Sequence, residues 1–321
     1  MTPDKSKKDE GVSIRDFRKS DLGDLLDLLS KSFAKEFEII GFDAAYLEGM
    51  ISQVFGARGR ILLGFMRLSG KDPLKFFVAE AKGRVVGTTV VNRSGKIGYI
   101  STVMVHPDYR NKGIATKLVR GAVDYIHGRG MERAILDVVS TNDPAVKVYT
   151  RIGFRAFEEV VQLIGETGSL SLQEGGVETR PYVGGDLDDA YDLIMASDEQ
   201  GHLRAYDFTK KQLEIPFWVR LFHIATQVRF VAVREGKAVG YISASYTTPK
   251  EAGIMGTSRV RPADRSQGIE LALIRAVVGE LKRGGIEKIR MGVPTTRPEL
   301  LEMARSLGMR DAMTLVGMCT T

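Results

Sequence analysis

The sequence has very little cysteine and no long apolar run. Its 321 residues include a single cysteine, Cys319, which excludes a disulfide framework within the chain. No segment approaches the roughly 20 consecutive apolar residues of a membrane-spanning helix. Residues 1–11 are polar and rich in lysine, without the apolar stretch of a secretory signal. We therefore expect no membrane partner and a reducing, cytoplasmic location.

Blocks of charge of one sign are also missing. The chain has 46 Lys and Arg against 40 Asp and Glu, a net charge of +6, and the two signs are interspersed. No basic run is interleaved with aromatic residues, so nucleic acid is not an expected partner. The small positive excess would instead favour an anionic ligand such as a nucleotide cofactor. The 43% hydrophobic and 27% charged content is typical of globular proteins, and the length fits two domains.

Hydrophobic periodicity in the first half predicts alternating strands and helices. The Lys82-Gly83 turn between two β-rich runs predicts a hairpin. Gly113 begins a segment with helical spacing, and Gly153 is a natural helix stop. The predicted strands are 13–17, 76–80, 84–91, 98–105, 134–139 and 155–164, and the predicted helices are 22–33, 44–55, 113–128 and 144–152.

The second half repeats the first in the same order. Phe77-Val78-Ala79 recurs as Phe230-Val231-Ala232. A collinear repeat of domain length indicates a duplicated fold and not a solenoid of short units. The small-residue segment 165–176 is long enough to link two domains, which predicts domains at 1–168 and 177–321. Further residues recur 155 positions on: Val105, Pro107, Arg110, Gly113 and Gly153 as Val260, Pro262, Arg265, Gly268 and Gly308.

The strand-to-helix junction at residues 103–116 carries the most chemical information. A helix that starts there aims several unpaired backbone N–H groups and its positive end at one point, which suits a phosphate. Gly113 allows close approach to the backbone, and Ala115 keeps the first turn free of bulk. Arg110 and Lys112 add positive charge beside it.

Two linked motifs resemble those of one family. Arg110-x-x-Gly113-x-Ala115 resembles the pyrophosphate-binding motif of the GNAT (Gcn-related N-acetyltransferase) superfamily. Asn142-Asp143-x-Ala145-x-x-x-Tyr149-x-x-x-Gly153-Phe154 resembles its second signature, at the expected distance. The match runs over residues 13–164 and extends weakly over the repeat from 177 onward.

The resemblance implies an α/β (α+β) chain of two GNAT-like domains, each a mixed, mainly antiparallel sheet flanked by helices. The fourth and fifth strands would separate, with the pantetheine arm of acetyl-CoA between them and its pyrophosphate on the loop amides. Acetyl-CoA is then the co-substrate, and no metal is expected. The implied cofactor-binding residues are Val103, Met104, Val105, Arg110, Asn111, Lys112, Gly113, Ile114, Ala115, Thr116 and Asn142.

Tyr149 is the implied catalytic residue. It falls where the family commonly has a tyrosine that protonates the departing CoA sulfur, and the alternative is a half-buried core tyrosine. The general base stays open, because residues 99–102 contain no carboxylate. A water relay that ends at Asp137, Asp108 or a second-domain residue is one solution. His106 is expected to be structural, because it belongs to the turn before the loop.

The second domain is predicted to be a degenerate copy. A carboxylate in the loop would repel a pyrophosphate, and an alanine cannot protonate a thiolate. The 155-position offset places Gln267 at Lys112, Glu270 at Ala115, Arg297 at Asn142 and Ala304 at Tyr149.

The expected reaction is transfer of an acetyl group from acetyl-CoA to a primary amine by direct attack, since no cysteine or activated serine lies near the motifs. The acceptor amine would belong to a protein N-terminus, a lysine or a small molecule. The alternative is a non-catalytic acyl-CoA-sensing or protein-interaction module. Retention of Tyr149 favours the enzyme.

Overall fold

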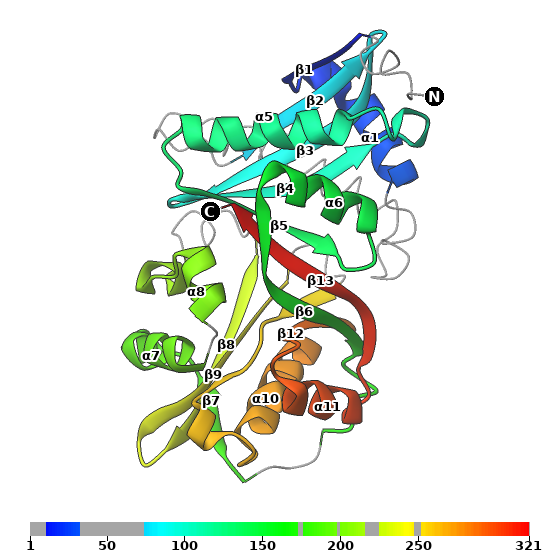
Figure 1. The fold of residues 1–321 in the computed structure, drawn as a ribbon. Coiled ribbons are helices and arrows are strands. Elements are labelled where there is room, and N and C mark those ends of the chain that lie inside the picture. The colour runs from blue at the N-terminus through cyan, green and yellow to red at the C-terminus, as the bar shows by residue number, and fades with distance from the viewer. Residues whose placement is uncertain are drawn as a thin grey trace. The chain divides into compact units, whose positions relative to one another are not determined.

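The chain forms two compact units. A computed structural model describes residues 11–32, 74–172, 176–197, 200–215, 225–246 and 252–320. The first unit contains residues 1–157 and 317–321, and the second contains residues 158–316 (Figure 1). The helix predicted at 44–55 lies outside the described residues. In the described part of the chain, no helix is both long and apolar enough to cross a membrane.

The first unit has the predicted mixed sheet. Its strands follow the order β1-β2-β3-β4-β5, with β13 (Arg310–Thr320) next to β5. The first three neighbouring pairs are antiparallel, whereas β4 and β5 are parallel. The elements are β1 Val12–Asp16, η2 Lys19–Asp21, α1 Leu22–Ser32, β2 Leu74–Ala81, β3 Arg84–Ser94, β4 Ile97–Val105, η3 Pro107–Tyr109, α5 Ile114–Gly128, β5 Arg133–Val139 and α6 Asp143–Ile152.

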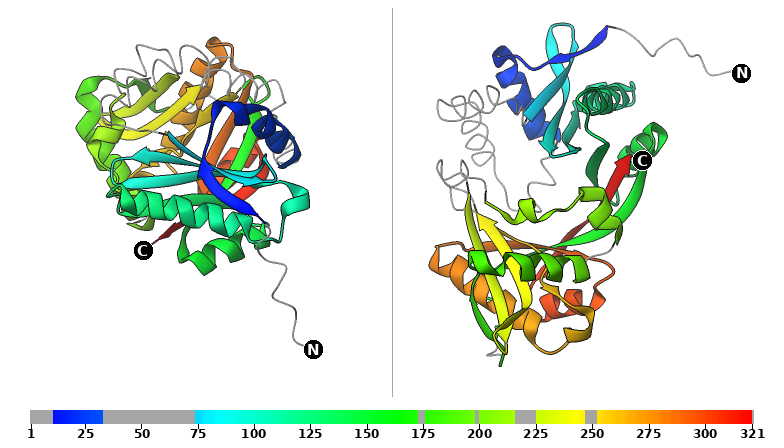
Figure 2. Two further views of the ribbon diagram at one scale, coloured as in Figure 1. Left: turned by 90° about the horizontal axis from the view of Figure 1, so that it is seen from above. Right: turned by 90° about the vertical axis from the view of Figure 1, so that its left-hand side faces the viewer.

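Helices α1 and α5 cover opposite faces of this sheet (Figures 1 and 2). Buried leucines of α1 pack with Met104, whereas Ile114 and Leu118 of α5 pack with Val105 and its neighbours. Adjacent residues of β4 point to opposite faces because strand side chains alternate. Gly87 lets α5 lie close, since a Cβ there would come within 3.1 Å of Leu118 Cδ1 and 3.3 Å of Ile114 Cγ2.

The second unit repeats this plan. Its strands follow the order β7-β8-β9-β10-β12-β6, and β11 pairs with β9. The elements are β6 Phe154–Glu166, β7 Glu178–Pro181, η4 Gly184–Asp186, α7 Leu187–Ser197, α8 Gln200–Tyr206, η5 Lys210–Leu213, β8 Thr226–Arg234, β9 Lys237–Tyr246, β10 Ala252–Met255, β11 Arg259–Val260, η6 Pro262–Asp264, α10 Ile269–Arg283, β12 Lys288–Pro294, α11 Pro298–Ser306 and β13 Arg310–Thr320.

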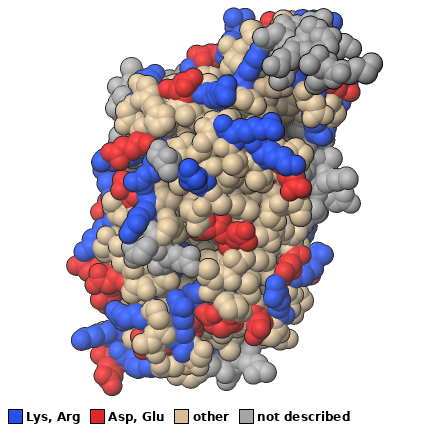
Figure 3. All heavy atoms as spheres, in the orientation of Figure 1, with Lys and Arg blue, Asp and Glu red and all other residues tan. Residues whose placement is uncertain are grey.

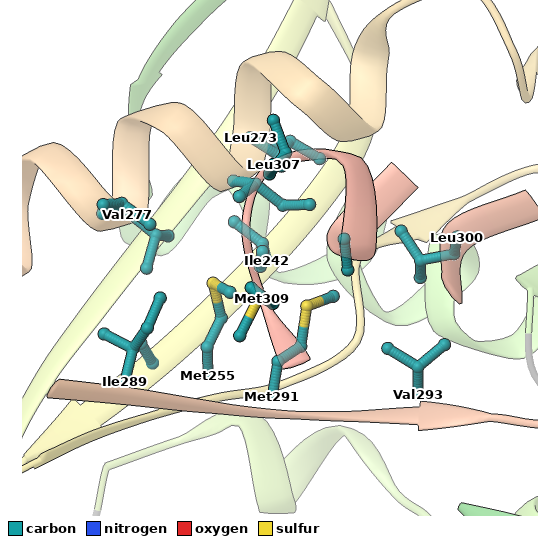
Figure 4. Close-up of a cluster of buried hydrophobic side chains, with 14 of the residues drawn as sticks. Ile242, Met255, Leu273, Val277, Ile289, Met291, Val293, Leu300, Leu307 and Met309 are labelled. Carbon is teal, nitrogen blue, oxygen red and sulfur yellow. The ribbon is translucent and has the colours of Figure 1, made fainter. Parts of the chain in front are cut away.

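The main core of the second unit lies between β12 and the helices α10 and α11. Ile289, Met291 and Val293 alternate along β12 and point toward Leu273 and Val277 of α10 (Figure 4). Each of these five side chains is 1% exposed or less. Helix α7 packs on the other face of the sheet in a separate cluster.

Part of the last strand of each repeat belongs to the other unit. Residues 160–166 of β6, which follow α6 in the chain, pair antiparallel with β12 in the second unit. Conversely, residues 317–321 belong to the first unit, where the backbone N–H of Ala134 donates to Thr320 Oγ1 at 3.0 Å. The predicted linker also begins inside the second unit, since Thr167 Oγ1 donates to the Ile286 carbonyl at 2.8 Å. The compact units therefore divide at residues 157 and 158, earlier than the predicted domain boundary.

A repeated ion pair shows the duplication in atomic detail. Arg15 binds Asp21 through two hydrogen bonds of 2.7 and 2.9 Å, and Arg180 binds Asp186 through two of 2.7 Å. Each carboxylate also accepts a backbone N–H three residues before it. Both pairs fasten the first strand of a repeat to the turn that precedes its first helix.

Candidate functional site

The loop between β4 and α5 begins with a structured turn. The backbone N–H of His106 donates to the Val86 carbonyl at 2.9 Å, which fixes the end of β4. The His106 side chain accepts from the backbone N–H of Asp108 and caps the short helix η3. The structure therefore places His106 in the turn role expected from its position.

The start of α5 leaves its first amides directed outward. Asn111 and Gly113 have left-handed φ values of 63° and 78°, which turn the chain into the helix. Ile114 is 2% exposed because its side chain lies in the core. Only its backbone N–H is therefore available to a ligand at the loop. A Cβ built at Gly113 would meet nothing within 4 Å. The first amides of the helix have no intrahelical acceptor and lie at its positive end, an arrangement that fits a pyrophosphate.

Basic side chains flank this loop. Arg110 and Lys112 are exposed. Arg110 Nε donates to the Val105 carbonyl at 3.3 Å, and Lys112 Nζ lies 4.9 Å from the ring centroid of Tyr109. The face in Figure 3 shows Lys and Arg intermingled with Asp and Glu, so positive charge is not gathered into one broad patch there. Any preference of the loop for an anion is therefore local.

Strands β4 and β5 separate after a short paired stretch. Their parallel pairing covers residues 97–99 and 133–135. Past an irregularity between Thr88 and Val90, β4 stays paired with β3 up to Val105. Thr102 has a φ of 57°, which is rare for a β-branched residue and marks local strain where the strand bends. The separation that the family resemblance implied is present in the first unit.

Helix α6 carries the other two predicted site residues. Asn142 caps the helix, because its Oδ1 accepts from the Ala145 N–H at 3.2 Å. Its Nδ2 is the side-chain atom that would donate to a ligand. Tyr149 is 6% exposed, and its ring centroid lies 6.1 Å from that of Phe154. Burial raises the pKa of the Tyr149 hydroxyl to about 12, so this group stays protonated at neutral pH.

A tyrosine and a carboxylate meet near the point where β4 and β5 separate. Tyr99 Oη donates to Asp137 Oδ2 at 2.7 Å. Tyr99 lies opposite Ile135 in the parallel register, and Asp137 follows two residues later on the same face of β5. The sequence named Asp137 only as one possible end of a water relay. The alternation along the strand was the signal that would have linked it to Tyr99.

The equivalent loop of the second unit has the same backbone but different side chains. Ser266 and Gly268 have φ values of 62° and 78°, within a degree of those of their counterparts in the first unit. Arg297 occupies the N-cap of α11, as Asn142 does in α6. The 155-position offset therefore holds in three dimensions at both motifs. Ala304, at the position of Tyr149, is fully buried in the core.

Buried charges occupy this part of the second unit. Glu270 and Arg297 are 2% and 5% exposed, and Arg297 Nη2 lies 3.4 Å from Glu270 Oε1. Burial raises the pKa of the Glu270 carboxyl, whereas its own backbone N–H, Arg297 and Arg265 favour the ionised form. Glu299 also pairs with Arg297, through its Nε.

Comparison with known proteins identifies the relatives of this arrangement. A chain region of 155 residues is 30% identical to an uncharacterized N-acetyltransferase of Methanocaldococcus jannaschii, covering 46% of this chain and 62% of that protein. A region of 98 residues is 36% identical to a mycothiol acetyltransferase of Streptomyces bingchenggensis, covering 30% of this chain and 32% of that protein. The chain thus matches about a third to under two thirds of the length of these relatives.

A solved structure and a family model extend over both units. A GCN5-related N-acetyltransferase from Sphaerobacter thermophilus matches with a TM-score of 0.67 and 18% identity, covering 96% of this chain and 95% of that one, which shows a shared fold. The model of the acetyltransferase (GNAT) family matches twice, at residues 28–154 and 187–309. The chain therefore belongs to the GNAT family and carries two copies of its domain.

Proposed function

We propose that the protein transfers an acetyl group from acetyl-CoA to a primary amine and that the first unit does the chemistry. The observation that carries this proposal is Tyr149, a buried and protonated hydroxyl on the helix that follows the separated strands. The equivalent position of the second unit holds the core residue Ala304. A hydroxyl in one repeat and a methyl in the other fits one working unit per chain.

Acetyl-CoA fits the groups that the first unit offers. Val103 and Val105 lie on β4, past the point where it separates from β5. Their backbone groups would hydrogen-bond the pantetheine arm as if it were an added strand. The amides of residues 111–116 would hold the pyrophosphate, with Arg110 and Lys112 beside them. Asn142 would donate through Nδ2. When bound, acetyl-CoA supplies a thioester carbonyl that an amine can attack.

The proposed proton steps use three side chains. An amine must lose a proton to attack, and Asp137 is the carboxylate that would accept it, either directly or through water. Tyr99 holds Asp137 in place through its 2.7 Å hydrogen bond. Tyr149, which is protonated at neutral pH, would donate its proton to the departing sulfur and then regain one from solvent, while Asp137 releases to solvent the proton it took from the amine. Direct attack is the economical route, since the motifs present no cysteine or activated serine.

The acceptor is proposed at the level of its chemistry. A primary amine of a peptide or of a small molecule meets the requirement for a neutral nitrogen nucleophile. The names of the relatives include both an uncharacterized N-acetyltransferase and a mycothiol acetyltransferase, which favour an amine without selecting one.

A screen of amines and peptides with acetyl-CoA tests this function by following the release of the free CoA thiol. The expected result is release that depends on an acceptor in the wild type and falls sharply in Asp137→Asn. Binding of acetyl-CoA with no transfer to any amine would favour the non-catalytic acyl-CoA sensor instead. Failure of both binding and transfer would refute the proposal.

A further inference from the structure

The second unit keeps the backbone of an anion-binding loop. Arg265 precedes the loop with a ψ of 160°, and Arg110 has a ψ of 161° at the same place in the first unit. Helix α10 follows Gly268 just as α5 follows Gly113, and both helices have 15 residues. The backbone conformation therefore gives the second loop the same feature as the first: unpaired backbone N–H groups that point toward one place at the positive end of a helix dipole.

A carboxylate of the protein lies at this helix end. Glu270 is the second residue of α10, and its own backbone N–H hydrogen-bonds its carboxylate. Arg297 approaches from the N-terminus of α11, with 3.4 Å between Nη2 and Glu270 Oε1. The carboxylate thus meets the two features that suit a phosphate at such a loop, a helix N-terminus and an arginine.

Within the described residues, two buried polar atoms at this helix end lack a hydrogen-bond partner: Glu270 Oε2 and Nε of Arg265, a residue whose charge favours the ionised Glu270. The hydroxyl of Ser258, a residue of the same unit with no exposed surface, also lacks a partner there. Ser258 occupies the position of Val103 under the 155-position offset, one residue before β11. Buried polar groups in proteins nearly always have hydrogen-bond partners. The Arg265 and Ser258 atoms therefore offer hydrogen-bonding groups that the Glu270 carboxylate does not use.

We propose that the second unit contains a phosphate-binding site whose anion is supplied by its own Glu270. The carboxylate takes the place of a phosphate group between the start of α10 and Arg297, and it keeps soluble anions out by filling that place. The ligand class of the site, once Glu270 is removed, is inorganic phosphate or pyrophosphate. On this view the second loop is occupied internally and has not lost its ability to bind anions.

The test is calorimetry of the full-length chain with inorganic pyrophosphate, at constant ionic strength. Glu270→Ala is expected to bind one equivalent more than the wild type, whatever number the first unit binds. The matched control is Glu299→Ala, which removes another carboxylate partner of Arg297 that lies outside the loop. This control is expected to gain no equivalent, with any extra binding at least tenfold weaker than in Glu270→Ala.

Three results would overturn the proposal. A folded Glu270→Ala chain that binds no additional pyrophosphate shows that the loop does not hold anions. An equal gain in Glu299→Ala shows a general effect of charge. If Glu270→Ala does not fold, Glu270→Ser takes its place, because it removes the charge and keeps a hydroxyl that can hydrogen-bond at the start of α10. Failure of both variants to fold with pyrophosphate present would show that the place requires a carboxylate. The number of pyrophosphate equivalents is compared with that of the wild type, so the result can be interpreted even if the protein shows no acetyl transfer.

Discussion

Replacing Tyr149 with phenylalanine removes one hydroxyl from the proposed site and leaves the ring. The ring packs beside Phe154 in a buried position, so the variant keeps the apolar contacts of the wild type. Loss of one hydrogen-bonding group costs about 1 kcal/mol of stability, which a folded domain tolerates. The expected effect is on catalysis.

That effect depends on a hydroxyl that carries its proton. Burial raises the pKa of the Tyr149 hydroxyl to about 12, so the acid is protonated across the working range. Proton donation by a positioned side chain is worth about 10²- to 10⁴-fold in rate. We therefore expect kcat to fall by that factor in Tyr149→Phe, with little change in affinity for acetyl-CoA.

Steady-state kinetics of CoA release, with calorimetry of acetyl-CoA binding, measure the two quantities separately. Tyr241→Phe is the matched control, because Tyr241 is a tyrosine of the second unit that is 4% exposed and whose pKa is also raised by burial. This control is expected to retain the wild-type kcat. A change of less than threefold in Tyr149→Phe, or an equal loss in the control, would assign Tyr149 to packing and refute the proton-donor role.

Three further changes test other parts of the structure. We expect one equivalent of CoA to bind per chain, and Gly113→Glu to abolish this binding, because it forces a side chain to a φ of 78° and adds a negative charge to the loop. Calorimetry measures the binding. The control Gly268→Glu, at the same φ in the second unit, should leave CoA binding intact. Asp21→Asn is expected to cost about 2 kcal/mol at pH 7 in denaturant unfolding. The hydrogen bond from Arg15 lowers the pKa of Asp21, so this stability is present above the unfolded pKa near 3.9 and is lost as the pH falls through the lower folded pKa. Asp186→Asn should cost less, because Arg180 is 38% exposed against 18% for Arg15, and equal costs would argue against this ranking. A fragment of residues 1–168 should unfold at a lower temperature than the full chain, because it lacks residues 317–320 and leaves residues 160–166 without their partner β12. A fragment that unfolds at the same temperature as the first unit of the full chain would contradict the exchange of strands.

Local features of this fold were readable from the sequence. Glycine at a left-handed position, capping residues and hydrophobic periodicity act within a few residues, and they predicted α5 and α6 to within a residue at their starts. The conserved spacing between repeats likewise predicted that Glu270 and Arg297 stand at the positions of Ala115 and Asn142. The paired opposite charges at those two positions were a signal of contact that the sequence reading did not use.

The pairing of distant strands was not readable in this way. Strand β6 has the same alternating pattern whether it joins the first sheet or the second, because periodicity reports which face is buried and not which neighbour is bonded. The contact of Tyr99 with Asp137 depends on the parallel register of β4 and β5, which again joins distant segments. Non-local choices of this kind are decided by packing of the whole sheet.

The exchange of strands has a consequence for how the protein is made. The N–H of Ala134 reaches its partner Thr320 across 186 positions of the chain, so β5 cannot gain that neighbour until residue 320 has left the ribosome. At about 5–20 residues per second, the first sheet waits roughly 10–40 s with an edge unprotected. An open edge is prone to pair with other chains, which makes this interval the period of greatest need for a chaperone. The second repeat thus supplies the first sheet with a neighbouring strand, and gene truncation that removed this repeat would leave the first sheet without it.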